Sequence, residues 1–161
     1  MAKYKDVEMP GDLYYFNSDN HVWLRIEEGN RVRCGIDQFG QKAAGTVAYV
    51  KIKPAGGTVT KGRALGTIEA GKYIGPVKSP VHGTILEVNQ DVLSSPSLIN
   101  TDSYGTGWLI LIEASNLQKD IIDLKHGEEE VSAWLEADYK KYEAEGLFAE
   151  KEKVEPEVES G

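Results

Sequence analysis

The chain has little of what marks a secreted, membrane-bound or nucleic-acid-binding protein. Cys34 is the only cysteine among its 161 residues, so no disulfide can form within one chain. No apolar run is long enough to cross a bilayer, and the start "MAKYKDVEMPGDLYY" lacks the apolar core of a signal peptide. The formal net charge of -8 leaves no basic excess for nucleic acid or an anionic membrane surface. We therefore expect a cytoplasmic protein whose partners are proteins or small molecules.

The chain also lacks the motifs of a stand-alone enzyme. Its three histidines, His21, His82 and His126, are far apart in sequence and have no cysteine or carboxylate at metal-ligand spacing. No glycine-rich phosphate loop, nucleophile elbow or zinc-type cysteine pair is present. Cys34 lies in "RVRCGI" with Val32 and Ile36 on the same face of a strand, and is expected to be a buried structural thiol. We predict no metal site and no catalytic residues.

What the chain does contain, between about residues 22 and 112, is a series of short β-branched runs separated by Gly, Pro, Asn and Asp. This pattern is typical of a compact all-β sandwich or barrel, and a hydrophobic content of 40% is enough to bury a core. Two short helices are expected within it. "DQFGQKAAG" has Asp37 as its N-cap, and "SSPSLIN" has Pro96 in its first turn.

The composition changes after about Asn116. "GEEEVSAWLEADYKKYEAEG" predicts a C-terminal helix that packs on the sheet through an apolar stripe and ends at Gly146. The remaining residues are charged and contain proline, with too little apolar surface to fold. We predict three parts: an N-terminal extension at residues 1–12, one domain at residues 13–146 that includes the helix, and a flexible tail at residues 147–161.

The segment "GTIEAGKYIGPVKSPVHG" places a lysine between two strand-like runs. Gly71 and Lys72 fit a two-residue hairpin of type II′, in which glycine takes the first position because it tolerates a positive φ. The side chain of Lys72 would then point into solvent from the tip. For an isolated exposed lysine, the simpler interpretation is that the charge only keeps the hairpin end soluble.

The sequence around this lysine resembles the modified-lysine hairpin of lipoyl carriers, and residues 13 to 146 resemble the glycine cleavage H protein family. The resemblance rests on separated motifs that recur in order: "HVWLRIEEGNRVRCGIDQFGQKAAGTVAYVKI", "GTVTKGRALGTIEAGKYIGPVKSPVHGTILEVN" and "SPSLINTDSYGTGWLILI". It implies a mainly β fold, a flattened barrel-sandwich hybrid of the lipoyl- and biotinyl-carrier type, with short helices and a C-terminal helix. It also implies a covalent lipoate on Lys72 and a carrier subunit that is not itself an enzyme.

The neighbours of the lysine refine this resemblance. Gly71 and Tyr73 flank Lys72 where H proteins usually have a small or β-branched residue before the lysine and Ala or Ser after it. The form "AGKYIGPVK" is similar to the lipoate-binding proteins of heterodisulfide-reductase-like sulfur oxidation. We therefore expect an arm that shuttles sulfur-bound intermediates or electrons to a heterodisulfide-reductase-like complex. The alternative is a glycine cleavage H protein that carries an aminomethyl group between glycine cleavage enzymes.

The resemblance also implies how the lysine is modified and presented. Lipoate ligase or lipoyl synthesis enzymes would load Lys72. From the residues themselves, we expect Glu69 to contact the loading enzyme, with an exposed strand carboxylate as the alternative. We expect Gly71 to shape the turn, and Tyr73 with Ile74 to give the arm an apolar, aromatic platform. Lys78, followed by "SP", is the rival attachment site and is expected in a strand or at its end.

Two other interpretations are disfavoured and a third stays open. Biotin carriers place their lysine between methionines, and the only methionines here are Met1 and Met9. Membrane-fusion adaptors interrupt such a domain with a coiled coil, and no heptad run interrupts this hairpin. An unmodified interaction module with the same fold is the third interpretation, and the intact mass of the protein from its host would identify it.

Overall fold

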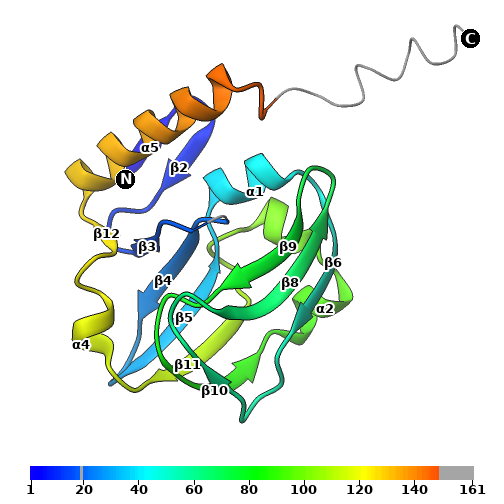
Figure 1. Cartoon of the computed structure of the whole chain (residues 1–161), viewed down its shortest axis with the longest axis vertical. Helices are drawn as coiled ribbons and strands as arrows, with labels where there is room; N and C mark the ends of the chain where they lie inside the picture. The colour runs from blue at the N-terminus through cyan, green and yellow to red at the C-terminus, as the bar shows by residue number, and fades with distance from the viewer. Residues whose placement is uncertain (19, 149–161) are drawn as a thin grey trace, which may run out of the picture.

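Short strands are the predominant regular structure of the molecule, as the β-branched runs predict. A computed structural model describes residues 1–18 and 20–148 (Figure 1). Its strands are β1 (Ala2–Tyr4), β2 (Val7–Met9), β3 (Tyr14–Phe16), β4 (Val22–Ile26), β5 (Arg31–Ile36), β6 (Val47–Ile52), β7 (Thr58–Val59), β8 (Ala64–Ala70), β9 (Ile74–Lys78), β10 (Gly83–Val88), β11 (Ile110–Ala114) and β12 (Lys125–His126).

Two antiparallel sheets enclose the main core. The larger has seven strands in the order β12-β3-β4-β5-β11-β10-β7, and the smaller has three in the order β6-β8-β9 (Figure 1). Val50 of β6, Ile68 of β8 and Val77 of β9 are buried in this core, on the inner face of the smaller sheet. Cys34 of β5 is in the same core, and burial raises the pKa of its thiol. The predicted buried thiol and the predicted flattened barrel are both confirmed.

Five helices complete the described chain: α1 (Gln38–Ala44), α2 (Gln90–Ser94), α3 (Leu98–Thr101), α4 (Leu117–Asp120) and α5 (Glu128–Ala144). Asp37 caps α1 as predicted, because its Oδ1 accepts the N–H of Gly40 at 2.7 Å. The prediction for "SSPSLIN" was wrong in detail. Two helices flank that proline, and Pro96 lies between them instead of in a first turn. No helix among the described residues is long and apolar enough to span a membrane.

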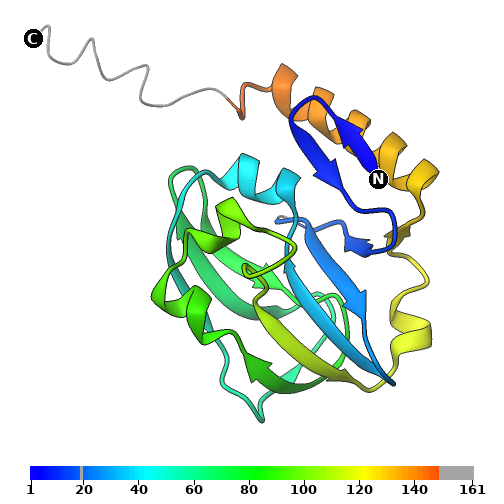
Figure 2. The same cartoon turned by 180° about the vertical axis from the view of Figure 1, so that it is seen from behind.

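A second core lies outside the barrel, between α5 and the hairpin formed by β1 and β2 (Figure 2). Trp134 of α5 packs on Tyr15 of β3, with ring centroids 6.0 Å apart, which agrees with the predicted packing of the helix on the sheet. The same helix also packs on the hairpin, where Tyr139 meets Tyr4 at 5.1 Å. The predicted N-terminal extension is therefore a folded part of this core. Of the predicted tail, all but Leu147 and Phe148 lies outside the described residues, and Phe148 packs against the second core.

A buried ion cluster joins α5 to the barrel. The imidazole of His21 lies between the rings of Phe39 and Trp134, with centroids 4.4 Å from each. Its Nε2 is 3.0 Å from Oδ2 of Asp138 on α5, and its Nδ1 is 3.4 Å from Oδ2 of Asp37. Burial lowers the pKa of His21, but the two carboxylates outweigh burial and raise the pKa to about 9. His21 is thus a charged structural residue.

Candidate functional site

The turn that carries Lys72 joins β8 to β9. The two strands pair in register up to Glu69 and Ile74, and the N–H of Ala70 donates to the carbonyl of Tyr73 at 2.8 Å. The predicted tight hairpin is therefore present. β8 is the middle strand and β9 an edge strand of the smaller sheet, so the sheet holds both ends of the turn in place.

The predicted geometry of this turn was wrong in two respects. Gly71 does not have a positive φ, so the turn is not of type II′. The turn also does not stand free in solvent, because the connection from α1 to β6 runs beside it. The N–H of Lys72 donates to the carbonyl of Ala44 at 2.7 Å, and the N–H of Gly71 donates to the carbonyl of Thr46 at 3.1 Å. The last carbonyls of a helix have no partner within it, so the lysine turn satisfies one at the end of α1.

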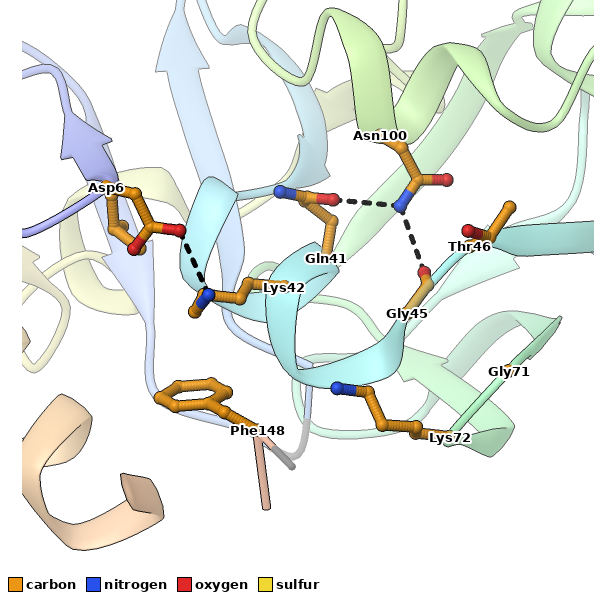
Figure 3. A pocket seen from close by; sticks show the side chains of 10 residues that line it. Asp6, Gln41, Lys42, Gly45, Thr46, Gly71, Lys72, Asn100 and Phe148 are labelled. Atoms are coloured by element: carbon orange, nitrogen blue, oxygen red, sulfur yellow. Dashed lines mark hydrogen bonds and ion pairs between the residues drawn. The ribbon is translucent and has the colours of Figure 1, made fainter. Parts of the chain in front are cut away.

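Lys72 is half-buried and lines a cavity of about 470 Å³. Figure 3 shows its side chain lying along the C-terminal end of α1, where a Cβ on Gly45 would be 3.5 Å from Cε of Lys72. A cavity of this size is typical of sites that take small organic groups. The lining residues are Asp6, Val7, Gln41, Lys42, Gly45, Thr46, Gly71, Lys72, Asn100 and Phe148.

One wall of the cavity carries an ion pair. Nζ of Lys42 on α1 is 2.9 Å from Oδ2 of Asp6, and Oδ1 of Asp6 accepts the hydroxyl of Tyr139 at 3.0 Å. Burial would raise the pKa of Asp6, but the hydrogen bonds from Lys42 and Tyr139 outweigh it and lower the pKa. Nζ of Lys42 also lies 4.9 Å from the centroid of the Phe148 ring. The N-terminal hairpin, α1 and the end of α5 therefore meet at this wall.

The other residues singled out from the sequence lie apart from the cavity. Glu69 is exposed and sits in register between Tyr49 and Ile74, away from the cavity lining. Tyr73 is half-buried against the main core, and its hydroxyl donates to the carbonyl of Pro76 at 2.9 Å, so it does not form an exposed platform. Lys78 ends β9, as expected.

Sequence reasoning missed Asp6, Lys42, Asn100 and Phe148, which complete the cavity. They come from separate parts of the chain. Lys42 and Asn100 belong to the quoted segments "DQFGQKAAG" and "SSPSLIN", but nothing in those patterns marks their side chains as cavity lining. Among the described residues, no cluster of His, Cys, Asp or Glu could hold a metal ion. Two primary amines line the cavity: that of Lys42 is ion-paired with Asp6, and that of Lys72 stands on the anchored turn, where it can take an attached group.

Comparison with known proteins identifies relatives over most of the chain. A family model described as glycine cleavage H-protein matches residues 13–137. "Glycine cleavage system H protein 2" of Aquifex aeolicus is 39% identical over 131 residues, covering 81% of each chain. "Glycine cleavage system H protein" of Myxococcus xanthus is 40% identical over 108 residues, covering 67% of this chain and 81% of the relative.

A solved structure extends the likeness to the fold. The crystal structure of a glycine cleavage system H protein from Mycobacterium marinum superposes with a TM-score of 0.68 at 30% sequence identity. The match covers 78% of this chain and 98% of that one. Glycine cleavage H proteins are carrier subunits, not enzymes, and carry lipoate attached covalently to a lysine. The predicted carrier class and cofactor are thereby confirmed.

The relatives also correct one prediction. The form "AGKYIGPVK" favoured a carrier of sulfur-oxidation intermediates with a heterodisulfide-reductase-like partner. The matching family model, the similar proteins and the similar structure all bear the glycine cleavage name, so that assignment was wrong. Its physical basis also fails in part, because Tyr73 folds back over β9 instead of presenting its ring beside the lysine. By sequence and by fold, the chain belongs to the glycine cleavage H-protein family.

Proposed function

We propose that this protein is the lipoyl carrier of a glycine cleavage system and that Lys72 is its attachment residue. The observation that carries the proposal is the placement of Lys72, whose backbone is anchored to Ala44 and whose side chain lines the cavity. Lys78, the rival, lies at the end of β9 and is not part of the lining. Glycine cleavage enzymes are the partners that this function requires, and a lipoate ligase or lipoyl synthesis enzymes would load the lysine.

The residues around Lys72 fit such a group. The cavity of about 470 Å³ begins at the lysine and is walled partly by glycine backbone and the Phe148 ring, which leaves room for a flexible acyl chain. Gly45 has no Cβ, so the stem of Lys72 can lie close against the chain at this point. When attached, the lipoyl group supplies a dithiolane whose sulfur atoms take up and release the aminomethyl group derived from glycine.

The protein's own contribution is to hold the attachment point of the lipoyl group in place. An amide bond to Nζ removes the charge of Lys72 and leaves the tether fixed at one backbone position. The two hydrogen bonds to Ala44 and Thr46 hold that position against the barrel. A tethered group stays at high effective concentration near the surface of its carrier, so successive enzymes can meet it without its release.

The test is reconstitution with a glycine decarboxylase. The purified protein is lipoylated, offered to the enzyme with glycine, and carbon dioxide release is measured. We expect turnover with the wild type and with Lys78→Arg, and none with Lys72→Arg, because arginine keeps a positive charge but cannot be acylated. Absence of turnover with the lipoylated wild type, or full turnover with Lys72→Arg, would contradict the proposal.

A further inference from the structure

Asn100, on the four-residue helix α3, holds the segment that anchors the lysine turn. Its Oδ1 accepts the N–H of Val47 at 2.9 Å. Its Nδ2 donates to the carbonyl of Gly45 at 2.9 Å and to Oε1 of Gln41 at 2.8 Å (Figure 3). These are long-range contacts, more than fifty residues apart for each pair. One side chain thus fixes both ends of the turn between α1 and β6.

The same segment supplies the acceptors for the lysine turn. Ala44 precedes Gly45 and accepts the N–H of Lys72, and Thr46 follows it and accepts the N–H of Gly71. The two carbonyls that hold the turn therefore flank the one carbonyl that Asn100 holds. A shift at Gly45 would move both of them.

Gly45 makes this segment dependent on an external support. Its φ of 88° and ψ of -168° belong to a region that only glycine enters readily, and glycine is the residue with the most conformational freedom in the unfolded chain. Its N–H caps α1 by donating to Gln41, but its carbonyl points out of the helix toward Asn100. An amide side chain can hold such a turn because it offers donors and an acceptor at once.

We propose that Asn100 is a positioning residue for Lys72. It sets the geometry in which Lys72 is acylated, acting through Gly45 and Val47 without touching the reacting amine. This role rests on the proposed attachment of lipoate to Lys72. Displacement of a reacting group by about 1 Å can lower a rate by up to 10²-fold, so a loosened turn has a measurable effect.

The most informative variant is Asn100→Asp, which changes one group and keeps an oxygen for the N–H of Val47. The carbonyl of Gly45 has no proton to offer, so a carboxylate there loses the hydrogen bond and repels the carbonyl oxygen. Gln41→Ala is the milder companion, because it removes the partner at 2.8 Å and leaves the bonds to Gly45 and Val47 in place.

Asn89 provides a matched control. Its Nδ2 donates to the carbonyls of Thr106 at 2.8 Å and Trp108 at 2.7 Å, and its Oδ1 accepts the N–H of Asp91 at 3.0 Å. The Asn89 side chain makes three hydrogen bonds, as the Asn100 side chain does, but Asn89 does not line the cavity. Asn89→Asp therefore reproduces the chemical change and its general effect on stability at a place unconnected with Lys72.

Two measurements are made on the full chain. The first is the hydrogen-exchange rate of the Lys72 amide by NMR, which needs no lipoate. The second is the rate of lipoylation of Lys72 by a lipoate-attaching enzyme, followed by peptide mass. For Asn100→Asp we expect amide exchange at least about tenfold faster and a kcat for lipoylation about tenfold lower, with KM nearly unchanged. Asn89→Asp should match the wild type in both. Gln41→Ala, which removes one of the three partners of Asn100 at the cavity wall, should fall between the wild type and Asn100→Asp.

Equal effects of Asn100→Asp and Asn89→Asp on both measurements would mean that Asn100 has only a structural role, and would overturn the proposal. The proposal would also be overturned if Asn100→Asp had no effect on either measurement. If Asn100→Asp is too unstable to study, Asn100→Ala removes all three side-chain hydrogen bonds without adding a charge and is judged by the same two criteria. A wild-type protein that is lipoylated elsewhere would refute the attachment site. The amide exchange would then still decide whether Asn100 holds the turn.

Discussion

At the scale of single residues, two glycines beside Lys72 have opposite requirements. Gly45 has a positive φ, and a Cβ there would lie 3.4 Å from the amide nitrogen of Lys72. Gly71 has no positive φ, and the nearest atom to an added Cβ is the Thr46 nitrogen at 4.0 Å. Glycine is therefore required at position 45, between α1 and β6, and is not required at position 71, in the lysine turn.

This contrast gives a paired prediction. Gly45→Ala should lower the free energy of unfolding by about 1–3 kcal/mol, because it forces a non-glycine residue into a strained backbone conformation. Gly71→Ala should leave it unchanged or raise it by up to about 1 kcal/mol, because alanine restricts the unfolded chain. Urea denaturation of the two variants measures both. A larger loss in Gly71→Ala than in Gly45→Ala would show that the turn geometry has been misassigned.

At the scale of elements, α5 is held to the barrel by charge as well as by apolar packing. Asp138 on the helix and Asp37 at the start of α1 face opposite nitrogens of the His21 imidazole, which is stacked between the rings of Phe39 and Trp134. Burial raises the pKa of Asp37, while the charge of His21 acts to lower it. Removal of the imidazole would leave Asp37 fully buried without its counter-ion.

We expect His21→Asn to lower the free energy of unfolding by about 3–5 kcal/mol at neutral pH, since breaking a buried pair leaves an uncompensated charge. Asparagine is the suitable replacement because His21 has a φ of 53°, which asparagine tolerates better than most residues. Lys140→Ala on the same helix, whose side chain is 61% exposed, is the control and should have little effect. Chemical denaturation followed by tryptophan fluorescence measures all three proteins.

The same cluster predicts a pH dependence. The folded pKa of His21 is raised to about 9, above the ordinary value of about 6.5, so the folded state binds the proton more tightly than the unfolded state. The stability from this group is fully present below about pH 6.5 and is lost as the pH rises through about 9. The difference between wild type and His21→Asn should therefore shrink between about pH 6 and pH 9.5. A difference that grows over this range would mean that His21 is neutral in the folded protein.

At the scale of the whole molecule, the N-terminal hairpin and α5 form a second core that closes one side of the lysine cavity. Met9 of β2 is fully buried in this core, and Asp6, in the turn before β2, lines the cavity. Met9→Ala should lower the free energy of unfolding by about 2–5 kcal/mol, as for other buried large-to-small changes. Lys3→Ala, on the exposed side of the same hairpin, should change it by less than about 0.5 kcal/mol. Equal, negligible effects would mean that residues 1–12 are a dispensable extension.

Much of the secondary structure of this molecule could be predicted from local patterns in its sequence. The Asp37 cap, the strands of the barrel, α5 and the hairpin with Lys72 each depend on contiguous residues with a recognisable period or turn. The cavity could not be predicted, because Asp6, Asn100 and Phe148 reach it from short elements or chain ends that show no period. The prediction of the turn geometry was wrong for the same reason. Its partners Ala44 and Thr46 lie more than twenty residues away in sequence, and no local rule includes them.

The central claim is that Lys72 carries the lipoyl group, and peptide mapping of the protein purified from its native host tests it most directly. Intact mass gives the number of lipoyl groups, and tandem mass spectrometry of the peptides around the β8–β9 turn gives their position. We predict one lipoyl group on each modified chain, attached to Lys72, with Lys78 unmodified. An unmodified chain, or a lipoyl group on Lys78 or any other lysine, would contradict the account.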